Sequence, residues 1–326
     1  MKKTITVAEF MNDALYNKDT GYYANHEPIG RGGDFITAPE MSQVFGETVA
    51  IWCIDTWHKL QYESNINIVE LGPGNGTMMQ DVLRVVDKLA TKPANAFLLE
   101  KSLKLRQRQQ QKLGGRPIWL DELEQLPAQP TLFLANEFFD ALPVDQYIYD
   151  DTGWKLRLVC IEEEQYKFVP GPKVSFDFLP EKAKLGDIFE HSEMQEEFAN
   201  KISQHLEENG GAALIIDYGY SDGYGDTLQA MRNNRYIDVL TNPGQADITT
   251  HVNFSWLKEL FSSKGLSTSD IIDQGRFLQQ FGIDQRTQLL CKNATKLQIA
   301  SLLSAAARLT APQHMGQLFK VLIVWS

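Results

Sequence analysis

The sequence has few cysteines and fewer basic than acidic residues. Its three cysteines, Cys53, Cys160 and Cys291, lie far apart and form no C-x-x-C pair, so we expect neither a disulfide framework nor a zinc knuckle. The net charge is -11, which argues against a nucleic-acid partner because phosphate binding needs a clustered basic surface. The six histidines show no metal-ligand spacing, and we predict no metal site.

Long hydrophobic runs are also missing. No stretch approaches the ~18 apolar residues that a membrane-spanning helix needs, so we expect no membrane insertion. The first residues, MKKTITVAEFMNDAL, include a lysine pair, but Glu9, Asn12 and Asp13 interrupt any apolar segment of a secretion signal. An Arg- and Ser-rich transit segment is absent as well. These features predict a cytoplasmic protein.

What the sequence does contain, from residue 65 onward, is an alternation of apolar strands and amphipathic helices. The strands are NIVEL, AFLLE, PIWL and TLFLA, and helical patterns separate the first three. Such alternation predicts a parallel sheet covered on both faces. The C-terminal MGQLFKVLIVWS has the pattern of one last, antiparallel strand. We therefore expect an α/β protein with a Rossmann-like sheet of seven mostly parallel strands.

Other segments depart from this alternation. Thr6 and Thr37 each precede a glutamate at capping-box spacing and predict two helix starts. A glycine-rich loop lies between these helices, and the turn Asp151-Thr152-Gly153 predicts an inserted antiparallel hairpin. The expected organisation is a helical cap with a lid loop over 1–60 and a main domain over 61–326, with insertions at about 143–190 and 218–250.

The stretch VELGPGNGTMMQDVL, residues 69–83, places three glycines between a predicted strand and a predicted helix. Such a turn lets a ligand approach the backbone at the carboxyl edge of a parallel sheet. Dinucleotide enzymes use G-x-G-x-x-G, but here the third glycine comes one residue early and Thr77 occupies its place. The pattern E-x-G-x-G-x-G, with Glu70 at the strand end, is typical of S-adenosylmethionine methyltransferases. A tight connection without a ligand is the alternative.

Further residues could complete a nucleoside site. Glu100 closes the next strand, where a carboxylate can accept hydrogen bonds from both ribose hydroxyls. Asp121 follows the third strand and could bind an adenine amine or cap the next segment. The loop 30–37, GRGGDFIT, is glycine-rich enough to act as a lid. The predicted cofactor-binding residues are Glu70, Gly72, Pro73, Gly74, Gly76, Thr77, Glu100, Asp121, Gly33 and Thr37.

A second group of polar residues follows the predicted strand TLFLA. Asn136, Glu137 and Asp140 come beside the glycine turn if that strand is buried in a parallel sheet. They are the predicted catalytic residues, although Asn136 could instead cap a helix over two core phenylalanines. Asp217, Tyr218 and His251, in DYGY and DITTHVNF, are predicted to bind the substrate. A plain turn and a structural histidine are the alternatives.

Six motifs in order resemble the MidA family, which includes a mitochondrial complex I assembly factor that acts as a protein-arginine methyltransferase. The motifs are GDFITAPEMSQVFGE, VELGPGNGT, ANEFFDALPVDQ, DYGY, GDTLQAMRNNRYID and PGQADITTHVNF. The resemblance implies a class I methyltransferase fold and S-adenosyl-L-methionine as cofactor. Gly72, Gly74 and Gly76 match the cofactor turn, and Asn136 and Glu137 match the motif after the fourth strand.

The resemblance also implies a protein substrate with an accessible arginine, for example a subunit of respiratory complex I. Glu137 and Asp140 could clamp a guanidinium, which is a poor nucleophile because its charge is delocalised. An assembly chaperone that binds the cofactor without catalysis is the main alternative. A nicotinamide dehydrogenase would need a glycine at position 77, and a purely structural interaction protein would use the turn only as architecture.

Overall fold

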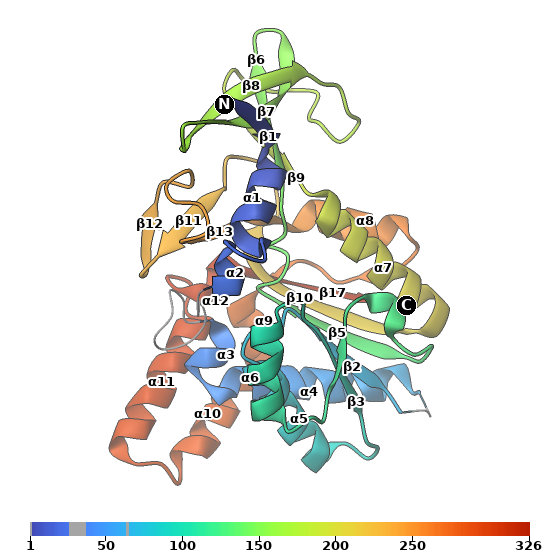
Figure 1. Ribbon diagram of the computed structural model, residues 1–326. Helices are drawn as coiled ribbons and strands as arrows, with labels where there is room; N and C mark the ends of the chain where they lie inside the picture. Colours follow the sequence, from blue (N-terminus) through green and yellow to red (C-terminus); the bar gives the residue numbers. More distant parts are fainter. Residues whose placement is uncertain (1, 26–36, 63–64) are drawn as a thin grey trace.

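A mixed sheet forms the centre of the molecule in the computed structural model, which describes residues 2–25, 37–62 and 65–326 (Figure 1). Five parallel strands lie side by side in the order β4, β3, β2, β5 and β10. The last strand of the chain, β17, pairs antiparallel with β10 and extends the sheet. The bounds are β2 (Asn67–Leu71), β3 (Asn95–Leu99), β4 (Ile118–Leu120), β5 (Thr131–Asn136), β10 (Gly211–Tyr220) and β17 (Phe319–Trp325).

The strand number differs from the expected seven. In the described residues the sheet has nine strands, so the α/β class and the antiparallel last strand are confirmed but the seven-stranded arrangement is not. The strands β14 (Val252–Asn253), β15 (Ser267–Thr268) and β16 (Ile272–Asp273) have two residues each. A strand of two residues leaves no alternating pattern in a sequence, which is why they were not expected.

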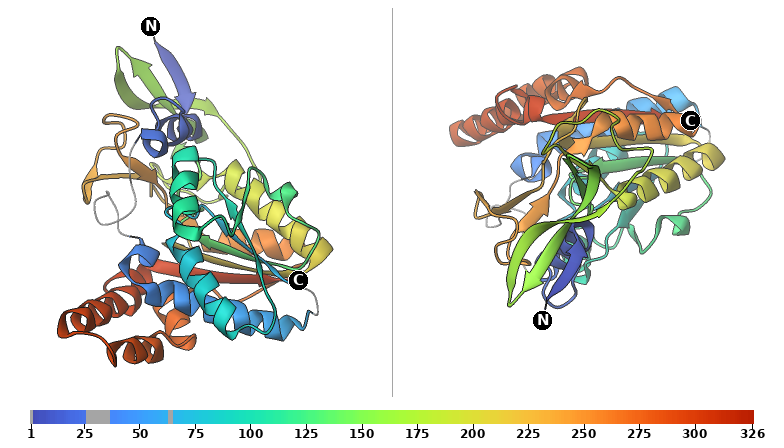
Figure 2. Two further views of the ribbon diagram at one scale, coloured as in Figure 1. Left: turned by 60° about the horizontal axis from the view of Figure 1, so that its bottom comes forward. Right: turned by 90° about the horizontal axis from the view of Figure 1, so that it is seen from above.

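Helices cover both faces of the sheet (Figure 2). One face packs against α4 (Gln43–Leu60), α5 (Thr77–Leu89), α9 (Gln274–Gln280) and α10 (Ile283–Cys291), and the other against α7 (Glu193–Asn209) and α8 (Phe254–Ser263). Neighbouring strand residues go to opposite cores: Ile68 and Leu134 to the first, Val69 and Phe133 to the second. This alternation explains why the parallel strands read as unbroken apolar runs.

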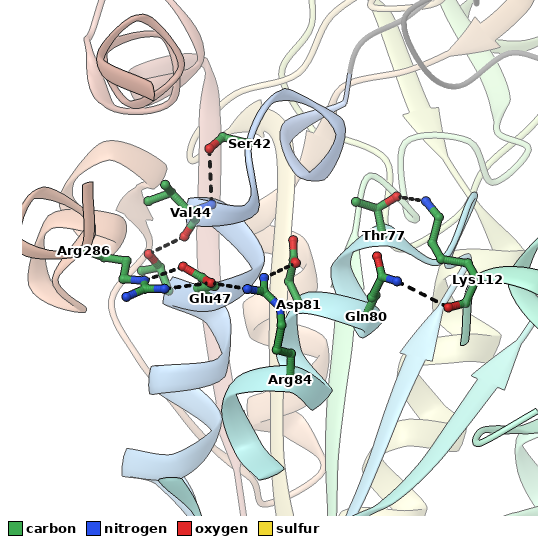
Figure 3. A network of polar contacts seen from close by, with 10 residues as sticks. Ser42, Val44, Glu47, Thr77, Gln80, Asp81, Arg84, Lys112 and Arg286 are labelled. Carbon is green, nitrogen blue, oxygen red and sulfur yellow. Dashed lines mark hydrogen bonds and ion pairs between the residues drawn. The ribbon is translucent and has the colours of Figure 1, made fainter. Parts of the chain in front are cut away.

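The covering helices are joined by a network around a buried glutamate (Figure 3). Glu47 on α4 pairs with Arg84 on α5 at 2.8 Å and also with Arg286 on α10. Close helix approach is possible because a Cβ on Gly46 would lie 2.7 Å from the Cβ of Asp81. The network therefore fixes the helix that follows the glycine turn to two other helices.

A separate five-stranded sheet stands beyond the carboxyl edge of the central sheet (Figure 1). It contains β1 (Lys3–Thr6), β6 (Asp145–Asp150), β7 (Gly153–Glu162), β8 (Gln165–Lys173) and β9 (Ile188–His191). The hairpin predicted around Thr152 is confirmed, because Asp150 pairs with Gly153. The strand β1 was not predicted, since its partner β7 lies about 150 residues away in the sequence.

The N-terminal helix α1 (Val7–Tyr16) joins this sheet to the second insertion. The predicted capping box of Thr6 and Glu9 is present at its start. Its apolar side packs with β13 (Asp247–Thr249), which forms a small sheet with β11 (Gln229–Arg232) and β12 (Arg235–Ile237). The short α2 (Tyr22–Asn25) and α3 (Ala38–Met41) follow. The start of the chain thus lies beside the edge where the strands end.

The remaining described helices are α6 (Leu103–Leu113), η1 (Leu123–Gln125), α11 (Lys296–Thr310) and α12 (Met315–Leu318). None of the helices in the described residues is long and apolar enough to cross a membrane. The same residues contain no group of three or more His, Cys, Asp or Glu side chains placed to hold a metal ion.

Candidate active site

The glycine turn between β2 and α5 needs all three of its glycines. Gly72, Gly74 and Gly76 have φ values of 60°, 51° and 73°, in the left-handed region that favours glycine. A Cβ on Gly72 would lie 2.9 Å from the Phe138 ring. The Gly76 amide donates to the carbonyl oxygen of Pro73 at 2.7 Å, which closes the turn. The turn therefore exposes backbone where the sheet ends.

Two buried glutamates flank this turn. Burial raises the pKa of Glu70 to about 8, and its Oε2 has no hydrogen-bond partner among the described residues. Glu100 follows β3 directly and accepts from the Ser102 amide at 2.8 Å. Burial raises the pKa of Glu100 as well, although the hydrogen bonds it accepts oppose this shift. The edge beside the turn is therefore rich in acceptors.

A residue that the sequence did not single out joins these parts. Gln109 on α6 is fully buried. Its Nε2 donates to the Gly74 carbonyl oxygen at 2.7 Å and to Glu100 Oε2 at 3.2 Å. Its Oε1 accepts from the Trp119 indole at 2.8 Å. Gln109 thus holds the turn and Glu100 in one arrangement, and its only sequence signal is a run of glutamines on a polar helix.

Asp121 lies at the end of β4 and is engaged by a neighbour. The Arg106 guanidinium donates to Asp121 Oδ1 at 2.7 Å and to the Leu120 carbonyl oxygen at 2.8 Å. The same side chain donates to the Glu100 carbonyl oxygen at 2.5 Å. Arg106 therefore ties the ends of β3 and β4 together, and Asp121 remains largely exposed.

The capping box expected at Thr37 is wrong. Thr37 precedes α3, but its side chain makes no capping hydrogen bond. Glu40 instead points to the glycine turn, where Oε1 accepts from Asn75 at 3.4 Å and from the Thr77 hydroxyl. Lys112 on α6 donates to the same hydroxyl (Figure 3). Thr77 therefore fixes α3 to the turn; Gly33 and most of the expected lid lie outside the described residues.

The loop after β5 is held by a buried carboxylate on the neighbouring strand. Asp217 Oδ2 accepts from the amides of Phe138, Phe139 and Asp140 at 3.0–3.2 Å, and Oδ1 accepts from the Tyr218 amide at 2.9 Å. Burial raises the pKa of Asp217, while these N–H donors favour the ionised form. Because backbone amides engage both oxygens, Asp217 positions the loop.

Asn136, Glu137 and Asp140 lie together on this loop. Glu137 has a φ of 50°, a strained value for a side chain with a Cβ. Its Oε1 accepts from Asn136 Nδ2 at 3.2 Å and from the Ala38 amide at 3.3 Å. Asn136 Oδ1 and Asp140 Oδ1 are buried and have no partner in the described part of the chain. Burial raises the pKa of Glu137 to about 7 and that of Asp140 to about 6.

Tyr218 and His251 lie next to this loop. Burial raises the pKa of Tyr218, and the nearby Asp140 adds to this shift. The Tyr218 ring meets the His251 ring edge to face at 5.4 Å. Burial lowers the pKa of His251, which favours a neutral imidazole. His251 also lines a small pocket, together with Tyr220 and Trp256. Tyr218 thus lies beside the carboxylates, and His251 lines the pocket next to them.

The structure adds a further carboxylate and two tyrosines to this region. Asp247 on β13 is buried, and its Oδ1 accepts from the Tyr23 hydroxyl at 2.9 Å. The rings of Tyr23 and Tyr16 stack at 5.6 Å, and the Tyr16 hydroxyl donates to the Ala141 carbonyl oxygen at 2.9 Å. Asp247 belongs to the motif PGQADITTHVNF, so that motif was its available signal.

Comparison with known proteins gives this arrangement a family. The model of an S-adenosyl-L-methionine-dependent methyltransferase family matches residues 48–272. The chain is 35% identical to protein arginine methyltransferase NDUFAF7, mitochondrial, of Danio rerio, over 97% of this chain and 82% of that protein. It is 32% identical to the protein of the same name from Homo sapiens, over 97% and 78% of the two chains.

The solved structures agree. A Burkholderia thailandensis protein, crystallised with S-adenosyl-homocysteine, superposes with a TM-score of 0.86 at 27% identity, over 99% of this chain and 88% of that chain. A native crystal structure from the same organism gives a TM-score of 0.83 at 27% identity.

The curated relatives also correct one prediction. They are named as mitochondrial proteins, so the prediction of a cytoplasmic protein was wrong by this comparison. Unpaired cysteines and an acidic composition indicate a reducing environment, which does not separate one such compartment from another. The sheet with its glycine turn, the family match over residues 48–272 and the relatives over nearly the whole chain lead to one conclusion: this protein belongs to a family of S-adenosyl-L-methionine-dependent methyltransferases.

Proposed function

We propose that this methyltransferase transfers the methyl group to an arginine of a protein substrate, at the carboxyl end of β5. The observation that carries the proposal is a pair of buried acceptors in the loop beside the glycine turn, Asn136 Oδ1 and Asp140 Oδ1, which have no partner among the described residues. Buried acceptors without donors are costly unless a ligand satisfies them. A guanidinium supplies five N–H donors and no acceptor.

The residues around the turn fit the cofactor. Glycines with left-handed φ let a ligand reach the backbone, and the unpartnered Glu70 Oε2 can accept a hydrogen bond from an ammonium group. Glu100 offers carboxylate oxygens to ribose hydroxyls. We propose that the cofactor is held by Glu70, Gly72, Pro73, Gly74, Gly76, Thr77, Glu100 and Asp121, with Gly33 and Thr37 from the lid side.

The protein's own contribution is alignment and charge. When bound, the cofactor supplies an electrophilic methyl group on a sulfonium. Glu137 and Asp140 clamp the guanidinium plane, localise its positive charge and turn one nitrogen toward the methyl group. One N–H proton must leave that nitrogen, and a carboxylate of this cluster receives it. Alignment of this kind is worth up to ~7–11 kcal/mol.

Three further residues shape the acceptor site in this proposal. Asp217 fixes the loop through backbone amides, Tyr218 lies beside Asp140, and His251 lines the adjoining pocket. The net charge of -11 favours a cationic protein segment. The relatives named protein arginine methyltransferase support arginine as the acceptor. Subunits of respiratory complex I are the first candidates to test, since the motifs resemble a family that includes a complex I assembly factor.

The proposal also includes the domain organisation of the chain. Residues 1–60 form a cap with a lid loop, and residues 61–326 form the methyltransferase domain with insertions at about 143–190 and 218–250. The Ala38 amide donates to Glu137, and Tyr16 donates to the Ala141 carbonyl oxygen. Both contacts link the N-terminal segment to the loop after β5, which supports a cap that completes the site.

The test is transfer of labelled methyl groups to protein. Wild-type protein and S-adenosyl-L-methionine with a tritiated methyl group are added to a lysate of cells that lack this protein, and labelled bands are analysed by mass spectrometry. The expected result is methylarginine in one or a few proteins. Label on another residue type would contradict arginine as the acceptor. No transfer, despite calorimetric binding of the cofactor, would favour the chaperone that binds the cofactor without catalysis.

A further inference from the structure

Asp247 occupies a position that the reaction as proposed above does not use. It starts β13 in the second insertion, yet its side chain is buried and reaches the N-terminal segment through the Tyr23 hydroxyl. Burial raises the pKa of Asp247 to about 8, with Asp140 as the next cause and Glu137 as a smaller one. The carboxylates of the β5 loop therefore oppose ionisation of Asp247.

The backbone brings β13 directly to that loop. The Thr250 amide donates to the Asp140 carbonyl oxygen at 3.0 Å, three residues beyond Asp247. On the other side, Tyr16 stacks on Tyr23 and donates to the Ala141 carbonyl oxygen. The strand that carries Asp247 therefore contacts both the loop after β5 and the N-terminal helices.

In the region around Asp247, several buried hydrogen-bond acceptors have no donor among the described residues. Asn136 Oδ1, Asp140 Oδ1 and Thr250 Oγ1 are all buried without a partner in residues 2–25, 37–62 and 65–326. None of the ion pairs within those ranges brings a lysine or arginine to Glu137, Asp140 or Asp247. Among the described residues, this region therefore has more acceptors than donors, and no ion pair with a lysine or arginine compensates its carboxylates.

Such a cluster defines its ligand by chemistry. Carboxylates that are buried near one another cannot all ionise unless a cation compensates them. A metal ion does not match, since the described residues offer no suitable set of ligands. A lysine ammonium is a compact point charge, whereas a guanidinium presents donors along two edges of a plane. Carboxylates on two different elements suit the planar guanidinium better than the ammonium.

We propose that Asp247 is a third carboxylate of the guanidinium clamp, in addition to Glu137 and Asp140, and that the Tyr23 hydroxyl holds it in position. This inference rests on the proposed transfer to arginine and names residues that recognise the charged guanidinium. It also gives the second insertion and the N-terminal segment a role in substrate recognition, because one supplies Asp247 and the other supplies Tyr23.

The experiment measures binding without catalysis. N-acetyl-L-arginine amide is titrated calorimetrically into the full-length protein saturated with S-adenosyl-homocysteine, and N-acetyl-L-citrulline amide, which is nearly isosteric and neutral, serves as the ligand control. We expect arginine amide to bind at least ~10-fold more tightly than citrulline amide, as for a hydrogen-bonded charge. Asp247→Asn keeps an acceptor for Tyr23 and should abolish most of that preference; Tyr23→Phe should reduce it ~3-fold.

Asp81→Asn is the matched control, because Asp81 is also a buried aspartate but lies in the network around Glu47. It should leave the arginine preference unchanged, and all three variants should bind S-adenosyl-homocysteine within about twofold of wild type. Equal responses to arginine and citrulline amides in wild type, including no response to either, would overturn the clamp. An unchanged preference in Asp247→Asn would overturn the role of Asp247.

The two proposals fail separately in these measurements. If wild type methylates arginine in proteins but Asp247→Asn keeps the full arginine preference, the clamp is wrong and the function stands. If wild type prefers arginine amide and loses that preference in Asp247→Asn, yet transfers no methyl group to any protein, the clamp stands and the proposed function is wrong.

Discussion

Replacing Gln109 by methionine should weaken cofactor binding although Gln109 was not among the predicted binding residues. Methionine keeps the length of the side chain and removes all three hydrogen bonds. The Gly74 carbonyl oxygen, Glu100 Oε2 and the Trp119 indole then lose their partner in a fully buried position. Because Gly74 and Glu100 lie on the proposed cofactor site, the loss should reach the ligand.

The size of the effect follows from these three bonds. A net hydrogen bond contributes ~1 kcal/mol, and one to a charged group ~1.5–3 kcal/mol. Loss of all three should lower the free energy of unfolding by about 3–5 kcal/mol. If about half of that loss arises from the turn and Glu100 moving apart, affinity for S-adenosyl-homocysteine falls ~10- to 100-fold, since 1.4 kcal/mol is tenfold.

Calorimetric titration with S-adenosyl-homocysteine measures the affinity, and urea denaturation measures the stability. Gln110→Met is the control, because Gln110 is the next residue of α6 and its side chain is exposed. It should change neither quantity measurably. A folded Gln109→Met variant that binds the ligand as tightly as wild type would refute the idea that Gln109 preorganises the turn.

Three more results are expected. Gly74→Val should abolish measurable cofactor binding in a folded protein, since a side chain at φ 51° costs ~1–2 kcal/mol and would crowd the ligand; unchanged calorimetric affinity would remove the cofactor from this turn. Glu100→Ala should weaken cofactor binding by about 1–3 kcal/mol, and a null effect would place the ribose elsewhere. Stability should fall as pH rises from 6 to 8.5, because Glu70 and Asp247, with pKa values raised to about 8, bind more protons folded than unfolded in that window. Urea midpoints in the double variant Glu70→Gln, Asp247→Asn should show a weaker pH dependence, and an equally steep fall there would contradict this assignment.

Local patterns in the sequence predicted local structure well. The capping box at Thr6 and the hairpin at Gly153 are decided by residues within a few positions of each other, and both are present. The glycine turn could be predicted for the same reason, because three left-handed backbone positions in five residues demand glycine. The sheet could be predicted from its apolar runs, apart from its two-residue strands.

Contacts between distant segments could not be predicted in this way. Thr37 and Glu40 have capping-box spacing, but Glu40 instead accepts hydrogen bonds from Asn75 and Thr77, which only the fold brings close. The contact of Asp247 with Tyr23 spans 224 positions. Asp217 was predicted to bind the substrate, but only the structure reveals that backbone amides engage both of its oxygens.

The most direct test of arginine methylation at the β5 loop is methyl transfer by Glu137→Gln. Glutamine keeps the side-chain shape and can still accept from Asn136 and the Ala38 amide, so cofactor affinity should stay within a few fold of wild type. If the charge of Glu137 acts on the guanidinium in the transition state, labelled transfer to an arginine-containing protein should fall at least ~10²-fold. Transfer that persists at the wild-type rate in this variant, with the cofactor bound equally well, would contradict the proposed mechanism.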